Sequence, residues 1–289
     1  MSTRILTLPD GRVLSLAQYG DPDGPPVFYF HGYPGSRLEV ALLDGLPLRV
    51  IAIDRPGYGD SSPLPGRRLL DWPADVAAAA DQLGLGRFTV LGVSGGGPYA
   101  AACAFALPRR VQAAILLCPV PPAYAIDSLP AAERGDLGLL MQLGRHPRVA
   151  RPFLATARWL GRQPHLLTPE TIRRYGPLRL PPSDMAALAE PASSRTLASF
   201  REGLRNGIEG VWMDAQIYAR PWGFALEQIE VPVAVWHGTA DTIVPFRTSE
   251  AYCAIPGARR TLVDGAGHYA MVITHGPGIV AEFVRCAPA

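Results

Sequence analysis

Short runs of consecutive apolar residues recur along this chain, and segments with helical periodicity separate them. Four such runs lie at 26–32, 49–57, 88–96 and 113–120. Runs that are apolar on both faces are typical of parallel strands buried inside a sheet. The segments 71–85 and 98–108 are predicted to be helices. Strands that alternate with helices predict the α/β class, with a doubly wound, mostly parallel sheet.

The middle of the chain has a different character. No strand-like run is found between residues 119 and 220, where Pro, Arg, Leu and Ala are frequent. The strand pattern resumes at 231–241 and 258–268, and a last helix is expected at 277–287. We therefore predict a helical cap inserted into the α/β core. The expected division is 1–119 for the first part of the core, 120–219 for the cap and 220–289 for the second part of the core.

Ser94 lies among glycines where a strand-like run gives way to a helical segment. The pattern G-x-S-x-G is met by Gly92-Val93-Ser94-Gly95-Gly96. A serine on such a turn needs a strained backbone to expose its hydroxyl, and glycines two positions away let strand and helix approach closely. The helix that follows offers backbone N–H groups and the positive end of its dipole. Ser94 is thus the candidate nucleophile; the alternative is a glycine-rich turn that only packs against a neighbouring strand.

A serine nucleophile needs a base, and the base needs an orienting acid. Among the six histidines, His268 follows the last strand-like run, in "DGAGHYA". Asp241 follows the penultimate run, in "HGTADTIVP". The other usual place for the acid, "CPVPPAYA" near Cys118, holds no carboxylate. The predicted order along the chain is therefore Ser94, Asp241, His268.

Several motifs agree in order and context with one known family. They are "HGYPGS", "DRPGYGDS", "GVSGGG", "HGTAD" and "GAGH". With these motifs the chain resembles the α/β-hydrolase superfamily, and in particular its capped serine hydrolases, in which a helical lid interrupts the sheet between its sixth and seventh strands. The resemblance implies that Ser94, Asp241 and His268 are the nucleophile, the acid and the base.

Acyl transfer develops negative charge on a carbonyl oxygen, and fixed N–H donors stabilise that charge. One donor is expected to be the backbone N–H of Gly95, the residue after the nucleophile. By the resemblance, the second is the N–H of Tyr33 in "HGYPGS". Pro34, which has no N–H of its own, restricts Tyr33 to extended conformations. Tyr33 and Gly95 are therefore the predicted oxyanion hole.

The cap is expected to roof the pocket and to set acyl selectivity without taking part in the chemistry. Trp212, Tyr218 and Phe224 are the candidate pocket residues. The alternative for these three, and for Trp222, is a packing role between cap and sheet, because buried aromatic side chains usually pack. His31 and His237 are expected to be hydrogen-bonding residues rather than acid–base groups.

The motifs together predict a cofactor-independent serine hydrolase that cleaves a small-molecule ester, or a related carbonyl substrate, through an acyl-enzyme. No metal site is expected. The same triad serves carbon–carbon bond hydrolases, lactonases and perhydrolases, so the fold alone does not choose among them. Gly95 stands where many perhydrolases and carbon–carbon hydrolases have Met. A ligand-binding protein of hydrolase fold with little turnover is the alternative from another class.

The composition of the chain limits the classes of partner that we expect it to bind. The formal net charge is +2, which gives no sign of a nucleic-acid surface. All 27 basic residues apart from histidine are arginines, and their scattered positions, with pairs such as Arg67-Arg68 and Arg109-Arg110, predict solvated faces. The four cysteines form no CxxC pair, and the first three lie in or beside apolar runs, which predicts buried free thiols.

The N-terminus has a turn signal at Pro9-Asp10-Gly11, which predicts a hairpin in place of the long apolar stretch of a signal peptide. No segment reaches the roughly 18 apolar residues of a membrane span. We therefore expect a cytoplasmic protein that acts on a small molecule. The sequence indicates no oligomeric state.

Overall fold

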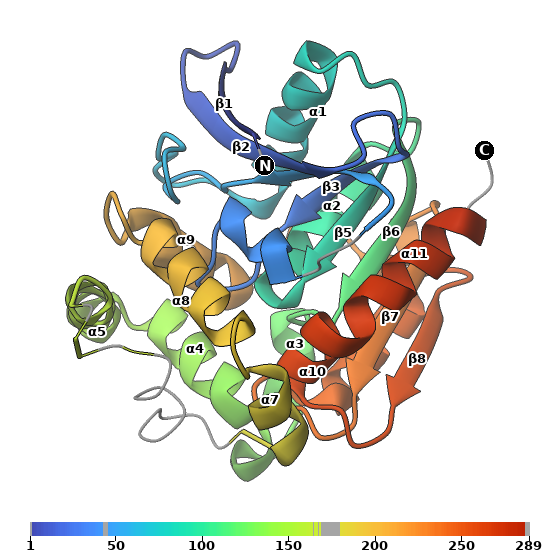
Figure 1. Ribbon diagram of the computed structural model, residues 1–289. Helices are drawn as coiled ribbons and strands as arrows, with labels where there is room; N and C mark the ends of the chain where they lie inside the picture. Colours follow the sequence, from blue (N-terminus) through green and yellow to red (C-terminus); the bar gives the residue numbers. More distant parts are fainter. Residues whose placement is uncertain (1, 43–45, 164, 167, 169–179, 287–289) are drawn as a thin grey trace.

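The computed structural model describes residues 2–42, 46–163, 165–166, 168 and 180–286, and within them it contains one eight-stranded sheet (Figure 1). The order across the sheet is β1-β2-β4-β3-β5-β6-β7-β8. The pairs β1·β2 and β2·β4 are antiparallel, and all other neighbours are parallel. The strands are β1 Ser2–Thr7, β2 Val13–Gly20, β3 Pro26–Phe30, β4 Arg49–Ile53, β5 Phe88–Val93, β6 Val111–Leu117, β7 Val233–Gly238 and β8 Arg259–Val263.

Helices follow most of the parallel strands, as the sequence predicts. The α-helices of the described residues are α1 Trp72–Gln82, α2 Gly97–Ala106, α3 Ala123–Asp127, α4 Gly135–Arg145, α5 Pro147–Gly161, α7 Pro182–Ala187, α8 Ala192–Gly203, α9 Glu209–Tyr218, α10 His268–Ala270 and α11 Gly276–Cys286. Short 3₁₀ segments include η1 Arg37–Leu42 and η3 Ser94–Gly96, and the π-helical turn η7 Met271–His275 joins α10 to α11. The predicted α/β class, with a doubly wound and mostly parallel sheet, is confirmed.

The central strands are buried on both faces, which explains their unbroken apolar sequence. On β3, Phe28 and Phe30 pack into the cluster that contains α1 and α2, while Val27 and Tyr29 pack into the opposite cluster with residues of α11. All four side chains are fully buried. Because successive strand residues point to opposite faces, a strand covered on both sides must be apolar at every position.

The described helices from α3 to α9 all fall between β6 and β7 in the chain. Figure 1 shows α4, α5, α7, α8 and α9 grouped together beside the sheet. This is the segment in which the sequence predicts a cap. The predicted boundaries, 120–219, remain a proposal, and positions 164, 167 and 169–179 of that range lie outside the described residues.

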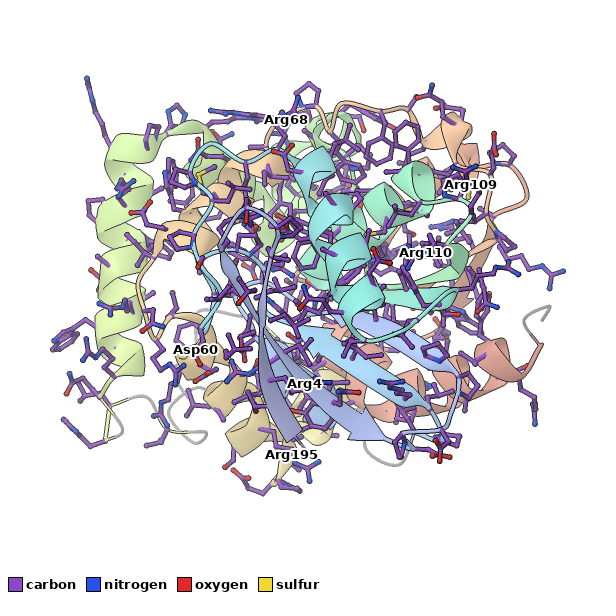
Figure 2. All side chains as sticks on the ribbon, turned by 90° about the horizontal axis from the view of Figure 1, so that it is seen from above. Arg4, Asp60, Arg68, Arg109, Arg110 and Arg195 are labelled. Carbon is purple, nitrogen blue, oxygen red and sulfur yellow. The ribbon has the colours of Figure 1, made fainter. Side chains whose placement is uncertain are left out.

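The prediction that the arginines lie on solvated faces holds for part of the set only. Arg68 and Arg109 are exposed, and both are labelled in Figure 2. It is wrong for Arg37, Arg55 and Arg67, which are buried. The physical reason is that each of these three is paired with a buried carboxylate. Paired guanidinium groups can be buried where unpaired ones cannot.

The cysteine prediction is confirmed at two positions and wrong at a third. Cys103 and Cys118 are buried free thiols, whereas Cys253 is free but exposed. Cys253 belongs to the 3₁₀ segment η6 Phe246–Ala254, where the buried side chains are Thr248, Ser249 and Tyr252. The apolar neighbours in the sequence therefore do not place Cys253 in the core. Within the described ranges, none of the helices combines the length and the apolar character that crossing a bilayer requires.

Candidate active site

Ser94 lies on the turn between β5 and α2, where the sequence predicts it. Its φ is 52°, in the left-handed region that a residue with a side chain adopts only at a cost. A Cβ atom on Gly92 would lie 2.5 Å from the carbonyl oxygen of Gly96, and one on Gly96 would collide with the carbonyl of Phe30. Glycine is therefore required at both positions, because strand and helix approach too closely for a side chain.

The loop after β3 lies against this turn. A Cβ on Gly95 would lie 2.8 Å from the Cβ of Tyr33, and one on Gly32 would lie 3.6 Å from the Cβ of Ser94. The two residues of the predicted oxyanion hole, Tyr33 and Gly95, are thus neighbours, although 62 positions separate them in the chain. This proximity is the first condition for two N–H groups to serve one oxyanion.

Buried side chains fix the backbone of that loop. Glu39 of η1 accepts a hydrogen bond from the N–H of Gly32 at 2.7 Å. Arg55 donates to the carbonyl of Gly32 at 2.9 Å and also to the carbonyl of His31. Burial raises the pKa of Glu39 to about 7, against the hydrogen bonds from Gly32 and Tyr29 that lower it. No sequence motif pointed to Glu39, whose carboxylate accepts from the backbone N–H of Gly32 and the hydroxyl of Tyr29.

Asp241 follows β7 and is held by an array of N–H donors. Its Oδ1 accepts from the backbone N–H groups of Ile243 and Val244, both at 2.9 Å. Its Oδ2 lies 2.7 Å from Nδ1 of His268. Burial acts to raise the pKa of Asp241, but the charge and hydrogen bonds of His268 and His237 outweigh it and hold that pKa well below the usual range. Asp241 is therefore an ionised carboxylate at neutral pH.

His268 begins the helical segment that follows β8. Its contact with Asp241 assigns the proton on Nδ1 and leaves Nε2 as the basic nitrogen. Burial lowers the pKa of His268, but the carboxylates of Asp241, Asp184 and Glu39 raise it, and the balance is a pKa above the ordinary histidine value. The pair has the form of a base held by an orienting acid.

The side chains of Ser94, Asp241 and His268 are nearly closed off from solvent, with 8%, 7% and 6% of their residue surfaces exposed. A surface hollow of about 440 Å³ lies elsewhere, against Gly161, Arg162, Ala198, Arg201, Glu202 and Arg205, and none of the candidate residues lines it.

His31 and His237 have the hydrogen-bonding environment that the sequence suggested. The ring of His31 contacts the carbonyl of Gly32 at 2.9 Å and accepts the N–H of Arg55 at 3.3 Å. Nε2 of His237 lies 3.1 Å from Asp241 and 2.9 Å from the carbonyl of Val244. Because both neighbours are acceptors, Nε2 of His237 carries a proton. His237 thus adds a donor to Asp241.

Cys118, His237 and Asp241 have ligand atoms within 4.8 Å of one another, which is a spacing that could hold a metal ion. The oxygens of Asp241 already accept four N–H groups, one of them from Nε2 of His237. A metal would have to displace this network, so the trio fits a metal poorly.

A second buried network, which the sequence did not reveal, centres on Asp214 of α9. This carboxylate accepts hydrogen bonds from five side chains of α2, α9 and the segment after β4, namely Arg55, Tyr58, Arg67, Tyr99 and Tyr218. Burial acts to raise the pKa of Asp214, but Arg55 and Arg67 outweigh it and hold that pKa well below the usual range. A lone acid among apolar residues, as in "VWMDAQIYA", is the only sequence signal for such a group.

The three candidate pocket residues lie in different surroundings. The hydroxyl of Tyr218 donates to the carbonyl of Gly95 at 2.9 Å, so this side chain reaches the turn that carries Ser94. Trp212 belongs to a buried cluster against which Tyr33 packs. Phe224 stacks on Phe105 of α2, with ring centroids 4.8 Å apart. Tyr218 and Trp212 thus border the turn of Ser94 and the loop after β3, and Phe224 packs against α2.

This sheet order, with a strained serine after β5 and a carboxylate–histidine pair after β7 and β8, is the arrangement of an α/β hydrolase. Comparison with known proteins agrees. The sequence profile of the family described as "alpha/beta hydrolase fold" matches residues 25–273. The chain belongs to this family, and it is an enzyme of the hydrolase class.

Individual relatives are similar over most of their length. A bifunctional esterase/perhydrolase from Acinetobacter calcoaceticus is 29% identical, with 84% of each chain covered. A non-heme chloroperoxidase from Streptomyces lividans is 30% identical, with 93% of this chain and 94% of the relative covered. Among solved structures, a bromoperoxidase from Bacillus anthracis has a TM-score of 0.69 at 20% identity, over 98% of this chain and 100% of that one. The last likeness shows the fold alone.

Proposed function

We propose that this protein hydrolyses carboxylic esters of small molecules through an acyl-enzyme formed on Ser94. The observation that carries the proposal is the 2.7 Å contact between Nδ1 of His268 and Asp241, on the same sheet as a serine held at positive φ. Nucleophile, base, orienting acid and a loop suited to oxyanion binding are the parts that ester hydrolysis needs. The esterase among the relatives gives separate support.

In the first half-reaction, Oγ of Ser94 attacks the ester carbonyl carbon while its proton passes to Nε2 of His268. Asp241 stabilises the imidazolium that results and keeps the ring in its tautomer. The carbonyl oxygen becomes an oxyanion, which accepts hydrogen bonds from the N–H groups of Tyr33 and Gly95. The carbon–oxygen bond to the alcohol then breaks, and the alcohol leaves with the proton from His268.

In the second half-reaction, water takes the place of the alcohol. His268 removes a proton from that water, and the hydroxide attacks the carbonyl carbon of the acyl–Ser94 ester. The bond between the carbonyl carbon and Oγ breaks, and Ser94 recovers the proton from His268. The sum is one ester and one water converted to one acid and one alcohol.

Perhydrolysis is the second candidate reaction, because the Acinetobacter relative is described as an esterase/perhydrolase and the Streptomyces relative as a chloroperoxidase. Here hydrogen peroxide replaces water in the second half-reaction and yields a peracid. A Cβ atom on Gly95 would lie 2.6 Å from the hydroxyl oxygen of Tyr218 and 2.8 Å from the Cβ of Tyr33, so a larger residue after the nucleophile requires these two side chains to move.

Turnover of p-nitrophenyl esters of two to twelve carbons tests the proposal, with Ser94→Ala as the blank. We expect repeated turnover with a burst of p-nitrophenol, and loss of both in the blank. Saturable ester binding with no sustained turnover would instead indicate a ligand-binding protein. Peracid formation from a carboxylic acid and hydrogen peroxide, measured in the same preparations, decides between hydrolysis alone and both reactions.

A further inference from the structure

The first turn of α7, in the middle of the cap segment, is hydrogen-bonded to the loop that carries His268. Oγ of Ser183 donates to the carbonyl of Gly265 at 2.9 Å and accepts the N–H of Gly267 at 3.0 Å. Oδ1 of Asp184 accepts the N–H of Ala270 at 2.8 Å. Two consecutive cap residues therefore hold the backbone on both sides of His268.

The side chain of Asp184 is a hydrogen-bond acceptor for the N-terminus of the helical segment that begins at His268. The first N–H groups of a helix have no partner within the helix and need one from outside. Here the acceptor for the N–H of Ala270 comes from a residue 86 positions earlier in the chain. Asp184 is fully buried, and its second oxygen, Oδ2, has no hydrogen-bond partner among the described residues. A buried carboxylate with an unpaired oxygen is costly unless a nearby charge compensates it.

That compensating charge is available from His268. Burial raises the pKa of Asp184, whereas the N–H of Ala270 and the charge of the His268 ring lower it; burial prevails. In return, Asp184 contributes to the raised pKa of His268, after Asp241. The two groups thus stabilise each other most when the imidazole is protonated, which is the state that forms during acyl transfer.

Gly267 shows how closely Asp184 approaches. A Cβ atom on Gly267 would collide with all three atoms of the Asp184 carboxyl group. The backbone of Gly267, with φ of −87° and ψ of −172°, is one that alanine also adopts. The space taken by Asp184, and not the backbone conformation, therefore accounts for the glycine that precedes His268.

We propose that Ser183 and Asp184 are positioning residues of the cap, which hold His268 in place and supply a second carboxylate to its imidazolium. His268 can then act as the base only while α7 is hydrogen-bonded to the loop that carries His268. This inference rests on the proposed function of His268. It also replaces the sequence-based expectation that the cap takes no part in the chemistry.

Other ionisable groups also act on His268, and the test must separate them from Asp184. Asp241 lies on the loop after β7, Glu39 on η1, and both raise the pKa of His268. Tyr269 follows His268 directly. Its pKa is raised by burial and by the carboxylates of Glu39, Asp184, Asp241 and Asp136. Cys118, which follows β6, and His237 of β7 contact Asp241. Of the three carboxylates that raise the pKa of His268, Asp184 is the one that can be changed without altering Asp241 or a hydrogen bond to the loop after β3.

Two substitutions separate position from charge. Asp184→Asn keeps an oxygen that can accept the N–H of Ala270 but removes the charge, and Asp184→Ala removes both. We expect Asp184→Ala to lower kcat by about 10- to 100-fold, with KM changed by less than about threefold. In Asp184→Asn we expect a smaller fall, and we expect the acid limb of kcat/KM against pH to move to lower pH. The shift follows because the imidazolium of His268 loses a nearby negative charge.

Asp127→Asn is the matched control. Asp127 is also a carboxylate of the cap segment, but it pairs with Arg145 at an exposed site, at 2.5 Å. We expect its kcat and pH profile to equal those of the wild type. A purely structural role for Asp184 would lower the amount of folded protein and leave the acid limb of the Asn variant unmoved, which would overturn the proposal.

Gly267→Ala gives a second, independent test. If its Cβ acts by displacing Asp184, Gly267→Ala should lower kcat as Asp184→Ala does, and the double variant should be no worse than either alone. Additive losses in folded proteins would contradict the proposal. Ser94→Ala distinguishes the two levels of inference: sustained turnover in that variant overturns the proposed function, whereas normal behaviour of the Asp184 variants overturns only the role of the cap.

Discussion

Ser94 and Asp241 show how single residues depend on the backbone around them. Ser94 keeps a positive φ because Gly92 and Gly96 allow β5, β3 and α2 to approach within contact distance. Asp241 keeps its charge in a buried place because backbone and imidazole N–H groups occupy both oxygens. In both cases the local chain, and not the side chain alone, creates the chemical property.

Asp241→Asn tests the orienting acid. The amide retains the shape but presents an N–H where Oδ2 now accepts, so the His268 ring is expected to lose its tautomer. We expect kcat to fall by about four orders of magnitude with little change in folding, as in other triads. Steady-state kinetics with circular dichroism measures both. A folded Asp241→Asn protein with near-normal kcat would show that another group orients His268.

The pH dependence of activity follows from the raised pKa of His268. The base must be neutral to accept the proton of Ser94, and a raised pKa keeps the imidazolium populated to higher pH. Activity should therefore fall on the acid side of a midpoint that lies above the ordinary histidine value. A profile of kcat/KM for a slow ester, over pH 5 to 9, measures this midpoint. A midpoint below that of an exposed histidine would contradict the environment described for His268.

At the scale of elements, α9 is joined to the core through Asp214. Its carboxylate faces the guanidinium groups of Arg55 and Arg67, and Arg55 in turn donates to the carbonyls of His31 and Gly32 in the loop after β3. The hydroxyl of Tyr218, also on α9, reaches the carbonyl of Gly95. The helix is therefore linked to both residues' surroundings in the predicted oxyanion hole, directly at Gly95 and through Arg55 at the loop after β3.

Asp214→Asn should be strongly destabilising, because it leaves two buried guanidinium groups without their carboxylate. We expect a loss of about 3–5 kcal/mol in the free energy of unfolding. Asp81→Asn is the control: Asp81 pairs with Arg110 at an exposed site, where a change of less than about 1 kcal/mol is expected. Urea denaturation measures both. Equal stability of Asp214→Asn and the control would contradict a paired, buried charge at this position.

Trp212, also on α9, is expected to influence acyl selectivity. It packs in the cluster that contacts Tyr33, so a smaller side chain would open space beside the loop after β3. We expect Trp212→Ala to shift preference between short and long acyl esters and to change labelling by a small phosphonate much less. Trp212→Phe serves where the alanine variant folds poorly, since a large-to-small change in a core costs about 3–5 kcal/mol. An unchanged chain-length profile would leave Trp212 with a packing role only.

At the scale of the whole molecule, the sequence predicted those features that depend on residues close together in the chain. The apolar runs located the parallel strands, and the glycines around Ser94 located the turn after β5. Asp184, Asp214 and Glu39 escaped prediction for one physical reason. Their partners are backbone groups or side chains brought together by folding, and nothing in the spacing of a lone carboxylate records such partners.

The buried arginines and Cys253 show that the sequence also fails to predict the burial of individual side chains. Arg67 stands next to Arg68 in the chain, but one is buried against Asp214 and the other is exposed. Cys253 lies beside buried Tyr252 and is itself exposed. Where neighbouring residues point in opposite directions, composition averages over them and cannot assign either.

Covalent labelling with a fluorophosphonate, followed by intact mass and peptide mapping, tests most directly whether this chain is a serine hydrolase. The reagent is attacked by an activated serine and mimics the tetrahedral state that the N–H groups of Tyr33 and Gly95 would hold. We expect one equivalent on Ser94, loss of ester turnover in proportion to labelling, and slow labelling in His268→Ala. Labelling that maps to another residue, or that persists in a folded Ser94→Ala variant, would contradict the assignment of Ser94 as the nucleophile.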